Sequence, residues 1–423
     1  MNEEDLKRLQ QDAVGYFLRA ANPDNGLIAD SSREGAPCSI ASTGLGLAAF
    51  AVGAERGFLP RRVAVALTLA ALRFFRDSPQ GEELDSTGHR GFYYHFLNMK
   101  TGRRIWQCEL STIDTAVLIA GVLTSGAYFS AASDDEREIR SLAGFLYERV
   151  DWRWATANGA LVRMGWKPGA GFQSYGWEGY SEAMLLYILG LGSPTHPLPS
   201  ESYSAWTRTY QWENLYNIDF LFAASLFIHQ LPQVWIDFRG LQDAFMREKR
   251  SDYFKNSQRA TAVQQQYALR NPMRFKGYGE NCWGITAGLG PGFSKQRTEG
   301  GIERQFYGYV SRGVPFGPDD GTLAPWAVVA SLPFAPEVVL AALRHFRDTY
   351  PEIISKDGLL TSFNPSFNDD GVHHGWLSPE HLGLDQGPVA LMIENYRSGM
   401  LWRLMRDCPA IVAGLRRAGF CKE

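Results

Sequence analysis

Residues 39–56 read SIASTGLGLAAFAVGAER, a segment made almost entirely of apolar and small side chains. Residues 112–132 have the same character, which is typical of a helix packed closely on all sides. Residues 61–77, RRVAVALTLAALRFFRD, instead place apolar and charged side chains on opposite faces of a helix. The two patterns predict an inner and an outer class of helix that alternate along the chain.

Apolar residues recur at helical spacing through the whole length, whereas strand signals are few and short. The predicted helices, about twelve in number, cover residues 3–20, 39–56, 60–77, 111–131, 133–150, 178–190, 217–230, 241–271, 322–332, 336–350, 386–406 and 409–418. Two glycine-flanked segments, 91–98 and 159–166, predict hairpins within loops. Helices without alternating parallel strands predict an all-α fold, an (α/α)6 toroid, with residues 1–423 forming a single domain.

Several connections between the predicted helices are long, aromatic and rich in glycine. They are residues 88–110, 151–178, 272–300, 311–322 and 358–385. Long structured loops in a compact domain are usually functional, and in a toroid of antiparallel helix pairs every second connection emerges at the same end. We therefore expect these loops to line one mouth of the toroid. Their aromatic faces would suit a sugar ring, although the same residues could instead plug the ends of the helical core.

The composition excludes several classes of partner. With 42 Lys and Arg against 45 Asp and Glu, the formal charge of -3 gives no reason to bind nucleic acid or an anionic membrane. The five cysteines form no C-x-x-C pair, so neither a disulfide framework nor a zinc site is indicated. The chain as given carries no leader and no apolar run long enough for membrane insertion. We expect a periplasmic protein if a leader has been removed, and otherwise a cytoplasmic one.

Motifs for several common chemistries are missing from the sequence. There is no GxSxG elbow, no phosphate-binding GxxxxGK[ST] loop, no HExxH and no complete GxGxxG. His373 and His374 are adjacent, so in an extended chain they point in opposite directions and form a poor chelating pair. We therefore expect no metal and no organic cofactor.

The strongest chemical signal is a set of carboxylates at loop-to-helix junctions, each near Trp or Tyr. The set comprises Glu109, Asp114, Glu178, Glu182, Glu280, Asp319 and Asp320. Glycoside hydrolysis needs one protonated carboxyl group to donate to the leaving oxygen and one ionised group to activate water or attack carbon. The alternative is that these acids only stabilise helix N-termini, and for Asp319, in a Pro-Asp-Asp-Gly turn, this alternative is favoured.

Glu182 precedes an apolar helix and follows an aromatic segment, so we expect it to be desolvated and to act as the acid. Asp114, in the first turn of another inner helix, or Glu109 is the better candidate for the base. Glu280 completes the predicted catalytic residues. The predicted substrate-binding residues are Trp106, Trp177, Glu178, Tyr180, Trp235, Arg239, Trp283, Asp320 and Gln386.

Several runs resemble one known family. They include GWEGYSEAMLLYILGLGSPTHPLP (176–199), YGENCWGITAGLGPG (278–292), DDGTLAPWAVVASLPFAPE (319–337) and LGLDQGPVALMIENYRSGMLW (382–402). The chain resembles, over at least residues 105–405, the glucoamylase-like family that includes glycoside hydrolase family 144. The resemblance implies an (α/α)6 barrel and inverting hydrolysis of β-1,2-glucan or sophoro-oligosaccharides.

The resemblance also implies roles for particular residues. Glu182 matches an essential acid, with Ser181 in place of the family's Asn, and Asp114 matches the acidic position of the first inner-helix motif. The run 235–239, WIDFR, would form a groove wall, although Asp237 and Arg239 could equally form a structural pair. Thr361 stands where the family tends to have an acidic residue.

The expected partner is a glucan or gluco-oligosaccharide, bound by a monomer or weak homodimer. Two alternatives remain open at the level of sequence. One is a glucosidase or transglycosylase of another linkage. The other is a non-catalytic glycan-binding protein, in which the aromatic loops bind sugar and the carboxylates serve only as helix caps.

Overall fold

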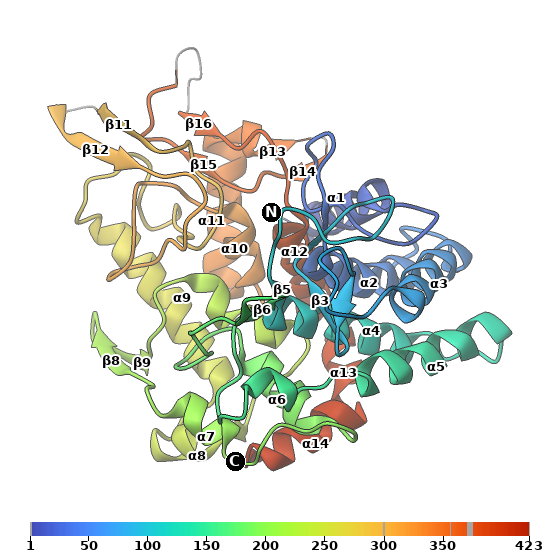
Figure 1. The fold of residues 1–423 in the computed structure, drawn as a ribbon. Coiled ribbons are helices and arrows are strands. Elements are labelled where there is room, and N and C mark those ends of the chain that lie inside the picture. Colours follow the sequence, from blue (N-terminus) through green and yellow to red (C-terminus); the bar gives the residue numbers. More distant parts are fainter. Residues whose placement is uncertain (1, 299–300, 356, 370–374, 423) are drawn as a thin grey trace.

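The computed structural model describes residues 2–298, 301–355, 357–369 and 375–422, and it is mostly helical (Figure 1). The helices fall into the two predicted classes. The helices buried on nearly every side are α2 (Ile40–Glu55), α4 (Thr112–Tyr128), α6 (Met184–Gly192), α10 (Pro325–Ala330) and α12 (Gly383–Arg397). The helices with one exposed face include α1 (Glu3–Ala20), α3 (Arg61–Asp77), α5 (Asp134–Glu148), α11 (Pro336–Thr349) and α14 (Pro409–Arg417).

Small residues let α2 and α4 lie in close contact. A Cβ atom added at Gly121 of α4 would lie 1.9 Å from the carbonyl oxygen of Gly44 in α2, and one added at Gly44 would lie 2.5 Å from the Cα of Leu118. Helix α2 also packs against α12, and α4 also packs against α6. The glycines of residues 39–56 therefore serve close packing at the centre of the fold.

The helix predicted over 217–230 is wrong. The chain instead forms a hairpin of β8 (Trp212–Leu215) and β9 (Ile218–Leu221), followed by the short 3-10 helices η2 (Leu226–His229) and η3 (Leu231–Val234). Tyr216 and Asn217 form the turn with left-handed φ values of 57° and 62°. Asn tolerates this conformation better than most residues, and two left-handed residues match the twist of a tight hairpin.

Two long predicted helices are each divided. The segment 241–271 contains β10 (Leu241–Gln242), α8 (Ala244–Glu248) and α9 (Tyr253–Arg270), because Asp243 and Asp252 each cap a new helix start. The segment 386–406 is divided between α12 and α13 (Met400–Arg406), because Gly399 adopts a left-handed φ of 67°. The apolar periodicity alone did not detect these breaks.

The two segments predicted as separate hairpins join one antiparallel sheet. Its order is β2 (Gly88–His89), β3 (Phe92–Tyr94), β5 (Leu110–Ser111), β6 (Gly165–Lys167) and β7 (Gly171–Phe172). Separately, β1 (Cys38–Ser39) pairs with β4 (Phe96–Leu97). These pairings bring the loops before α2 and α4 to the same region of the molecule.

The remaining regular elements are short. The strand pairs are β10 with β17 (Cys421–Lys422), β11 (Ser294–Arg297) with β12 (Glu303–Phe306), β13 (Ile354–Ser355) with β14 (Gly358–Leu359), and β15 (Phe363–Asn364) with β16 (Trp376–Leu377). The short helices are η1 (Trp154–Thr156), α7 (Ser202–Thr207) and η5 (Pro351–Ile353). Among the described residues, no helix combines the length and apolar character needed to cross a membrane.

Candidate active site

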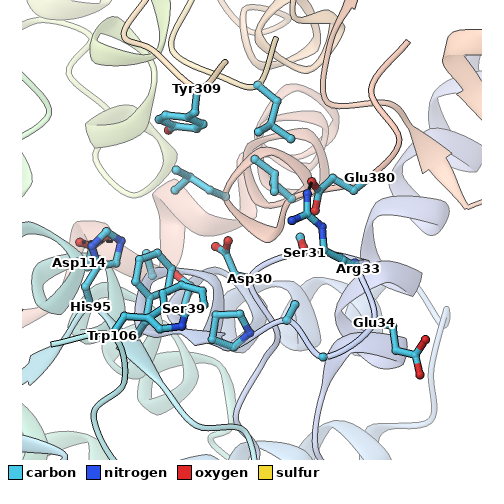
Figure 2. Close-up of a pocket in the computed structure, with 18 residues that line it drawn as sticks. Asp30, Ser31, Arg33, Glu34, Ser39, His95, Trp106, Asp114, Tyr309 and Glu380 are labelled. Atoms are coloured by element: carbon cyan, nitrogen blue, oxygen red, sulfur yellow. Dashed lines mark hydrogen bonds and ion pairs between the residues drawn. The ribbon is translucent and has the colours of Figure 1, made fainter. Parts of the chain in front are cut away.

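A cavity of about 510 Å³ opens where α2, α4 and α12 begin (Figure 2). We call it the Asp114 cavity. Its polar and aromatic lining consists of Asp30, Ser31, Arg33, Glu34, Ser39, His95, Phe96, Trp106, Asp114, Tyr309 and Glu380. Helix N-termini carry partial positive charge, so the position of the cavity favours negative charge within it.

Asp114 lies in the first turn of α4 and is fixed by the residue that caps this helix. The Ser111 hydroxyl accepts a hydrogen bond from the backbone N–H of Asp114 at 3.2 Å and donates one to the Asp114 carboxylate. The imidazole of His95 lies beside both predicted base candidates. Its Nδ1 is 2.9 Å from Glu109 Oε1, and its Nε2 is 3.6 Å from Asp114 Oδ2.

This arrangement favours a charged imidazole between two carboxylates. Burial opposes the charge on His95, but the charge of Asp114 and the hydrogen bond with Glu109 outweigh it and raise the pKa of His95 to about 9. Burial likewise opposes the charge on Glu109, yet the bond with His95 brings its pKa below the ordinary value. At neutral pH, His95 is therefore a cation, and it favours the ionised form of Glu109.

Glu182 precedes α6 at a loop-to-helix junction. Burial raises the pKa of Glu182 to about 7, and the charge of Asp114 contributes in the same direction. The desolvated environment expected from the sequence is present, and the coupling to Asp114 places Glu182 within electrostatic reach of the cavity. Its catalytic role stays a prediction.

Two acidic residues that the sequence analysis did not select also belong to this cluster. Burial raises the pKa of Asp30 to about 6, opposed by His95. Burial raises the pKa of Asp385, in the first turn of α12, well above its ordinary value, and its Oδ2 has no hydrogen-bond partner among the described residues. Thr361, which replaces an acidic residue of the family, is hydrogen-bonded to Asp385.

The sequence carries a signal for Asp385 but none of the same kind for Asp30. Asp30 lies in a loop without a Trp or Tyr neighbour, and Asp385 lies within the quoted LGLDQGP run, directly before the predicted helix 386–406. The search for carboxylates next to aromatic residues therefore passed over both.

Among the predicted sugar-binding aromatic residues, Trp106 lines the cavity. Its side chain is 70% exposed and packs in a tilted arrangement against Phe96, with ring centroids 5.4 Å apart. Trp177 is half-buried, and its Nε1 donates to Thr112 Oγ1 at 3.1 Å. Tyr180 packs against Tyr210 and other aromatic rings. Neither Trp177 nor Tyr180 lines the Asp114 cavity.

Three predicted substrate-binding residues lie in the core. Trp283, Asp320 and Gln386 are each 0% exposed. Asp320 forms a bidentate ion pair with Arg312, with both contacts at 2.8 Å, and Gln386 donates to the carbonyl oxygen of Leu359. Their burial favours structural roles for Asp320 and Gln386, whose side chains are paired within the protein, and the predicted contact of the three residues with substrate stays a prediction.

Two predicted acids lie at the surface and outside the cavity lining. Glu178 forms an ion pair with Arg208 at 2.7 Å. Glu280 is exposed, and its backbone carbonyl accepts a hydrogen bond from Gln265. Asp319 accepts hydrogen bonds from the hydroxyls of Tyr267 and Tyr278, which agrees with the structural interpretation of that residue.

The predicted groove wall lies in a second cavity, of about 480 Å³, lined by residues of α13, α14 and the WIDFR run. We call it the Arg239 cavity. Trp235 is fully buried, and Arg239 makes a bidentate ion pair with Asp237 while lying 4.7 Å from the ring centroid of Trp402. The structure therefore separates Trp235 and Arg239 from the Asp114 cavity and favours the structural-pair interpretation.

Within the part of the chain that the structure describes, no group of three His, Cys, Asp or Glu side chains could hold a metal ion. His373 and His374 lie outside the described residues, so the structure gives no test of the prediction made for them.

The chain belongs to a known family of carbohydrate-active proteins. Residues 174–409 match the sequence profile of the glycoamylase family, described as "Putative glucoamylase". A curated relative, the exo β-1,2-glucooligosaccharide sophorohydrolase (non-reducing end) of Parabacteroides distasonis, is 26% identical over 99% of this chain. The match spans 58% of that relative's own length.

Solved structures resemble the chain over its whole length. A protein of Bacteroides uniformis described as a putative glucoamylase is 29% identical, with a TM-score of 0.87, and the match covers 100% of this chain and 98% of the other. An endo-β-1,2-glucanase of Chitinophaga pinensis, solved with sophorotriose and glucose, has a TM-score of 0.87 at 24% identity, covering 100% and 99%. At this identity the second likeness shows the fold alone.

Proposed function

We propose that this chain is a glycoside hydrolase that cleaves β-1,2-linked glucan or gluco-oligosaccharides of the sophorose series. The observation that carries the proposal is a pair of unlike, electrostatically coupled carboxyl groups: Asp114 lines the cavity beside the His95 cation, and Glu182 has a pKa of about 7, raised by burial and by the charge of Asp114. Glycoside hydrolysis requires such a pair, in which one carboxyl group is protonated and acts as the acid while the other is ionised. The linkage is supported by the name of the Parabacteroides relative, an exo β-1,2-glucooligosaccharide sophorohydrolase.

Glu182 is the proposed general acid. With a pKa of about 7, a large share of the enzyme carries the Glu182 proton at neutral pH, where an ordinary glutamate has lost it. In this mechanism the proton passes to the glycosidic oxygen as its bond to the anomeric carbon breaks.

Asp114 is the proposed general base, with Glu109 as the alternative. The Ser111 hydroxyl, the N-terminus of α4 and the His95 cation all stabilise a negative charge on Asp114. In the inverting mechanism that we propose, Asp114 takes a proton from a water molecule that attacks the anomeric carbon from the opposite face. No metal or organic cofactor takes part.

We further propose that the helices close into an (α/α)6 toroid and that residues 1–423 form one domain. Helices α2, α4, α6, α10 and α12 would be its inner ring, with the η2–η3 segment in the position of a further inner helix. The contacts of α2 with α4 and α12, of α4 with α6, and of α10 with α12 support this ring.

The test is hydrolysis of defined glucans. Purified protein should release reducing ends from β-1,2-glucan or sophoro-oligosaccharides, and not from starch or laminarin. Proton NMR of the first products should show the α-anomer, as inversion requires. Activity on another glucan in place of β-1,2-glucan would contradict the proposed linkage. Release of the β-anomer would contradict the inverting mechanism. Binding of the glucan without hydrolysis would identify a glycan-binding protein.

A further inference from the structure

Tyr309 lies across the Asp114 cavity from the residues discussed so far. It belongs to the connection between β12 and α10, and Figure 2 shows it on one side of the cavity with Asp30, His95 and Trp106 on the other. Its side chain is 53% exposed, so the ring is free to contact a ligand. The hydroxyl group of Tyr309 interacts electrostatically with four acidic side chains, Asp385, Asp30, Asp114 and Glu182.

The backbone on both sides of Tyr309 is held in place by a buried ion pair. Arg312 donates to the carbonyl oxygens of Tyr307 and Gly308, both at 3.1 Å, and to that of Gly288 at 2.8 Å. Arg312 and its partner Asp320 have side chains only 1% and 0% exposed. The buried Asp320 therefore acts on the cavity indirectly, by fixing the segment that carries Tyr309.

Tyr309 also borders a second, much smaller cavity, of about 30 Å³, which we call the polar chamber after three of its nine lining residues; besides Tyr309, the others are the apolar Phe227, Leu231, Ala287, Leu384 and Pro388. Three buried side chains in its lining, Gln230, Trp326 and Asp385, are each at most 4% exposed. Each has an atom without a hydrogen-bond partner among the described residues: Oε1 of Gln230, Nε1 of Trp326 and Oδ2 of Asp385.

Unpaired buried polar atoms are costly, so these three side chains gain from a polar group that enters the chamber. Together they offer a donor and acceptors to a group of about the size of one hydroxyl. Because Tyr309 and Leu384 line both the polar chamber and the Asp114 cavity, a sugar in the larger cavity lies next to the smaller one.

We propose that Tyr309 and Trp106 form the two walls of a glucosyl subsite, from which one hydroxyl-bearing group of the sugar enters the polar chamber. This inference rests on the proposed function. A glucosyl ring offers apolar C–H faces to both aromatic rings and hydroxyl groups at its edge. Gln230, Trp326 and Asp385 then select the sugar by its hydroxyl, because an analogue without that group leaves them unpaired.

The aromatic wall is tested by binding, in a Glu182→Gln background that prevents turnover. Tyr309→Ala should weaken binding of sophorotriose by about tenfold, whereas Tyr309→Phe should retain most of the affinity. Phe316→Ala is the matched control, because Phe316 is an aromatic residue 70% exposed in the same connection and outside the cavity lining. If Tyr309→Ala and Phe316→Ala bound sophorotriose with equal affinity, the proposal that the Tyr309 ring contacts the sugar would be wrong.

The polar chamber is tested with sophorose derivatives that each lack one hydroxyl group. One derivative should bind about tenfold more weakly than sophorose. In Trp326→Phe, which keeps an apolar ring and removes the N–H donor, that derivative and sophorose should bind equally. If Trp326→Phe still bound sophorose about tenfold more tightly than that derivative, the proposed role of the polar chamber in binding the hydroxyl would be wrong.

The role of Asp320 is tested by a double-variant cycle. Asp320→Asn should weaken binding, and combining it with Tyr309→Ala should add little, because Asp320 acts through Tyr309. Circular dichroism separates this effect from unfolding, and additive losses would contradict the indirect role. Failure of the wild type to bind or hydrolyse any β-1,2-linked oligosaccharide would overturn the proposed function and this subsite with it. Hydrolysis that survives in Tyr309→Ala with unchanged KM would overturn the subsite alone.

Discussion

The Asp114 cavity and the Arg239 cavity are similar in size but lie at opposite ends of the inner helices. Leu384, in the first turn of α12, lines the former, and Trp402, in the helix that follows α12, lines the latter. Helix α12 has 15 residues and is about 22 Å long. Both cavities contain tryptophan and charged side chains, so neither residue type by itself distinguishes them.

The difference is how the acidic side chains are neutralised. In the Arg239 cavity, Asp237 is matched by two hydrogen bonds from Arg239. Asp30, which lines the Asp114 cavity, and Glu182, which is coupled electrostatically to Asp114, have no such partner among the described residues, and burial raises the pKa of each. His95 is shared between Glu109 and Asp114. Unmatched carboxyl groups with shifted pKa values are typical of catalytic sites, and matched ones of structural sites.

The largest expected effect is the loss of the acid. Glu182→Gln should lower kcat on β-1,2-glucan by about 10²- to 10⁴-fold while retaining the fold and oligosaccharide binding, because the amide cannot protonate a leaving group. Glu178→Gln is the matched control, since Glu178 lies in the same segment but is exposed and paired with Arg208. Steady-state kinetics check the prediction, and near-native turnover in Glu182→Gln would exclude this acid.

Removal of the shared cation should have a smaller effect that depends on pH. In His95→Gln, Asp114 loses the cation beside it, and Glu109 loses the charged partner that opposes its burial, so the pKa of Glu109 should rise. The base must be ionised, so the acidic limb of the kcat/KM profile should move to higher pH, with a loss of about tenfold near pH 5. An acidic limb at the wild-type position would show that His95 does not control the base.

Removal of an exposed aromatic wall should affect binding more than turnover. Trp106→Ala should raise KM for sophoro-oligosaccharides roughly fivefold, which corresponds to a loss of about 1 kcal/mol of binding free energy, because the ring is exposed and lines the Asp114 cavity. Its folding stability should change little. Kinetics and thermal unfolding of the same variant measure both quantities, and an unchanged KM would assign Trp106 to loop packing.

The smallest expected effect lies in the Arg239 cavity. Arg239→Ala should leave kcat and KM unchanged and lower the free energy of unfolding by about 1 kcal/mol, since Arg239 is 55% exposed and also packs on Trp402. Denaturant unfolding and activity assays check it. A substantial rise in KM would instead restore the WIDFR run as part of the substrate groove.

Much of the helical fold could be predicted because helices that pack closely on all sides need small and apolar residues, which can be recognised in the sequence. The small residues of 39–56 and the one-sided pattern of 61–77 each indicated the correct class of helix. The breaks could not be predicted from periodicity, because Asn217 and Gly399 act through backbone conformation while their neighbours remain apolar.

The candidate site could be predicted only in part. Glu182, Asp114 and Glu109 were found because they stand at helix starts beside aromatic residues. Asp320 has the same local sequence features but is neutralised by Arg312, a partner that only the folded structure identifies. Asp30 comes from a loop that is placed by the pairing of β1 with β4 and by a hydrogen bond from the backbone N–H of Gly383. Tyr309 comes from a loop held by Arg312, which also donates to the carbonyl oxygen of Gly288.

The most direct test is a carbon-13 NMR titration of the Glu182 carboxyl group, assigned by the loss of its signal in Glu182→Gln. Because burial and the Asp114 charge disfavour ionisation, the group should titrate with a pKa of about 7 in the wild type and at a lower pH in Asp114→Asn. An ordinary glutamate pKa of about 4.3 in both proteins would contradict the account, because no acid would then be protonated at this position at neutral pH.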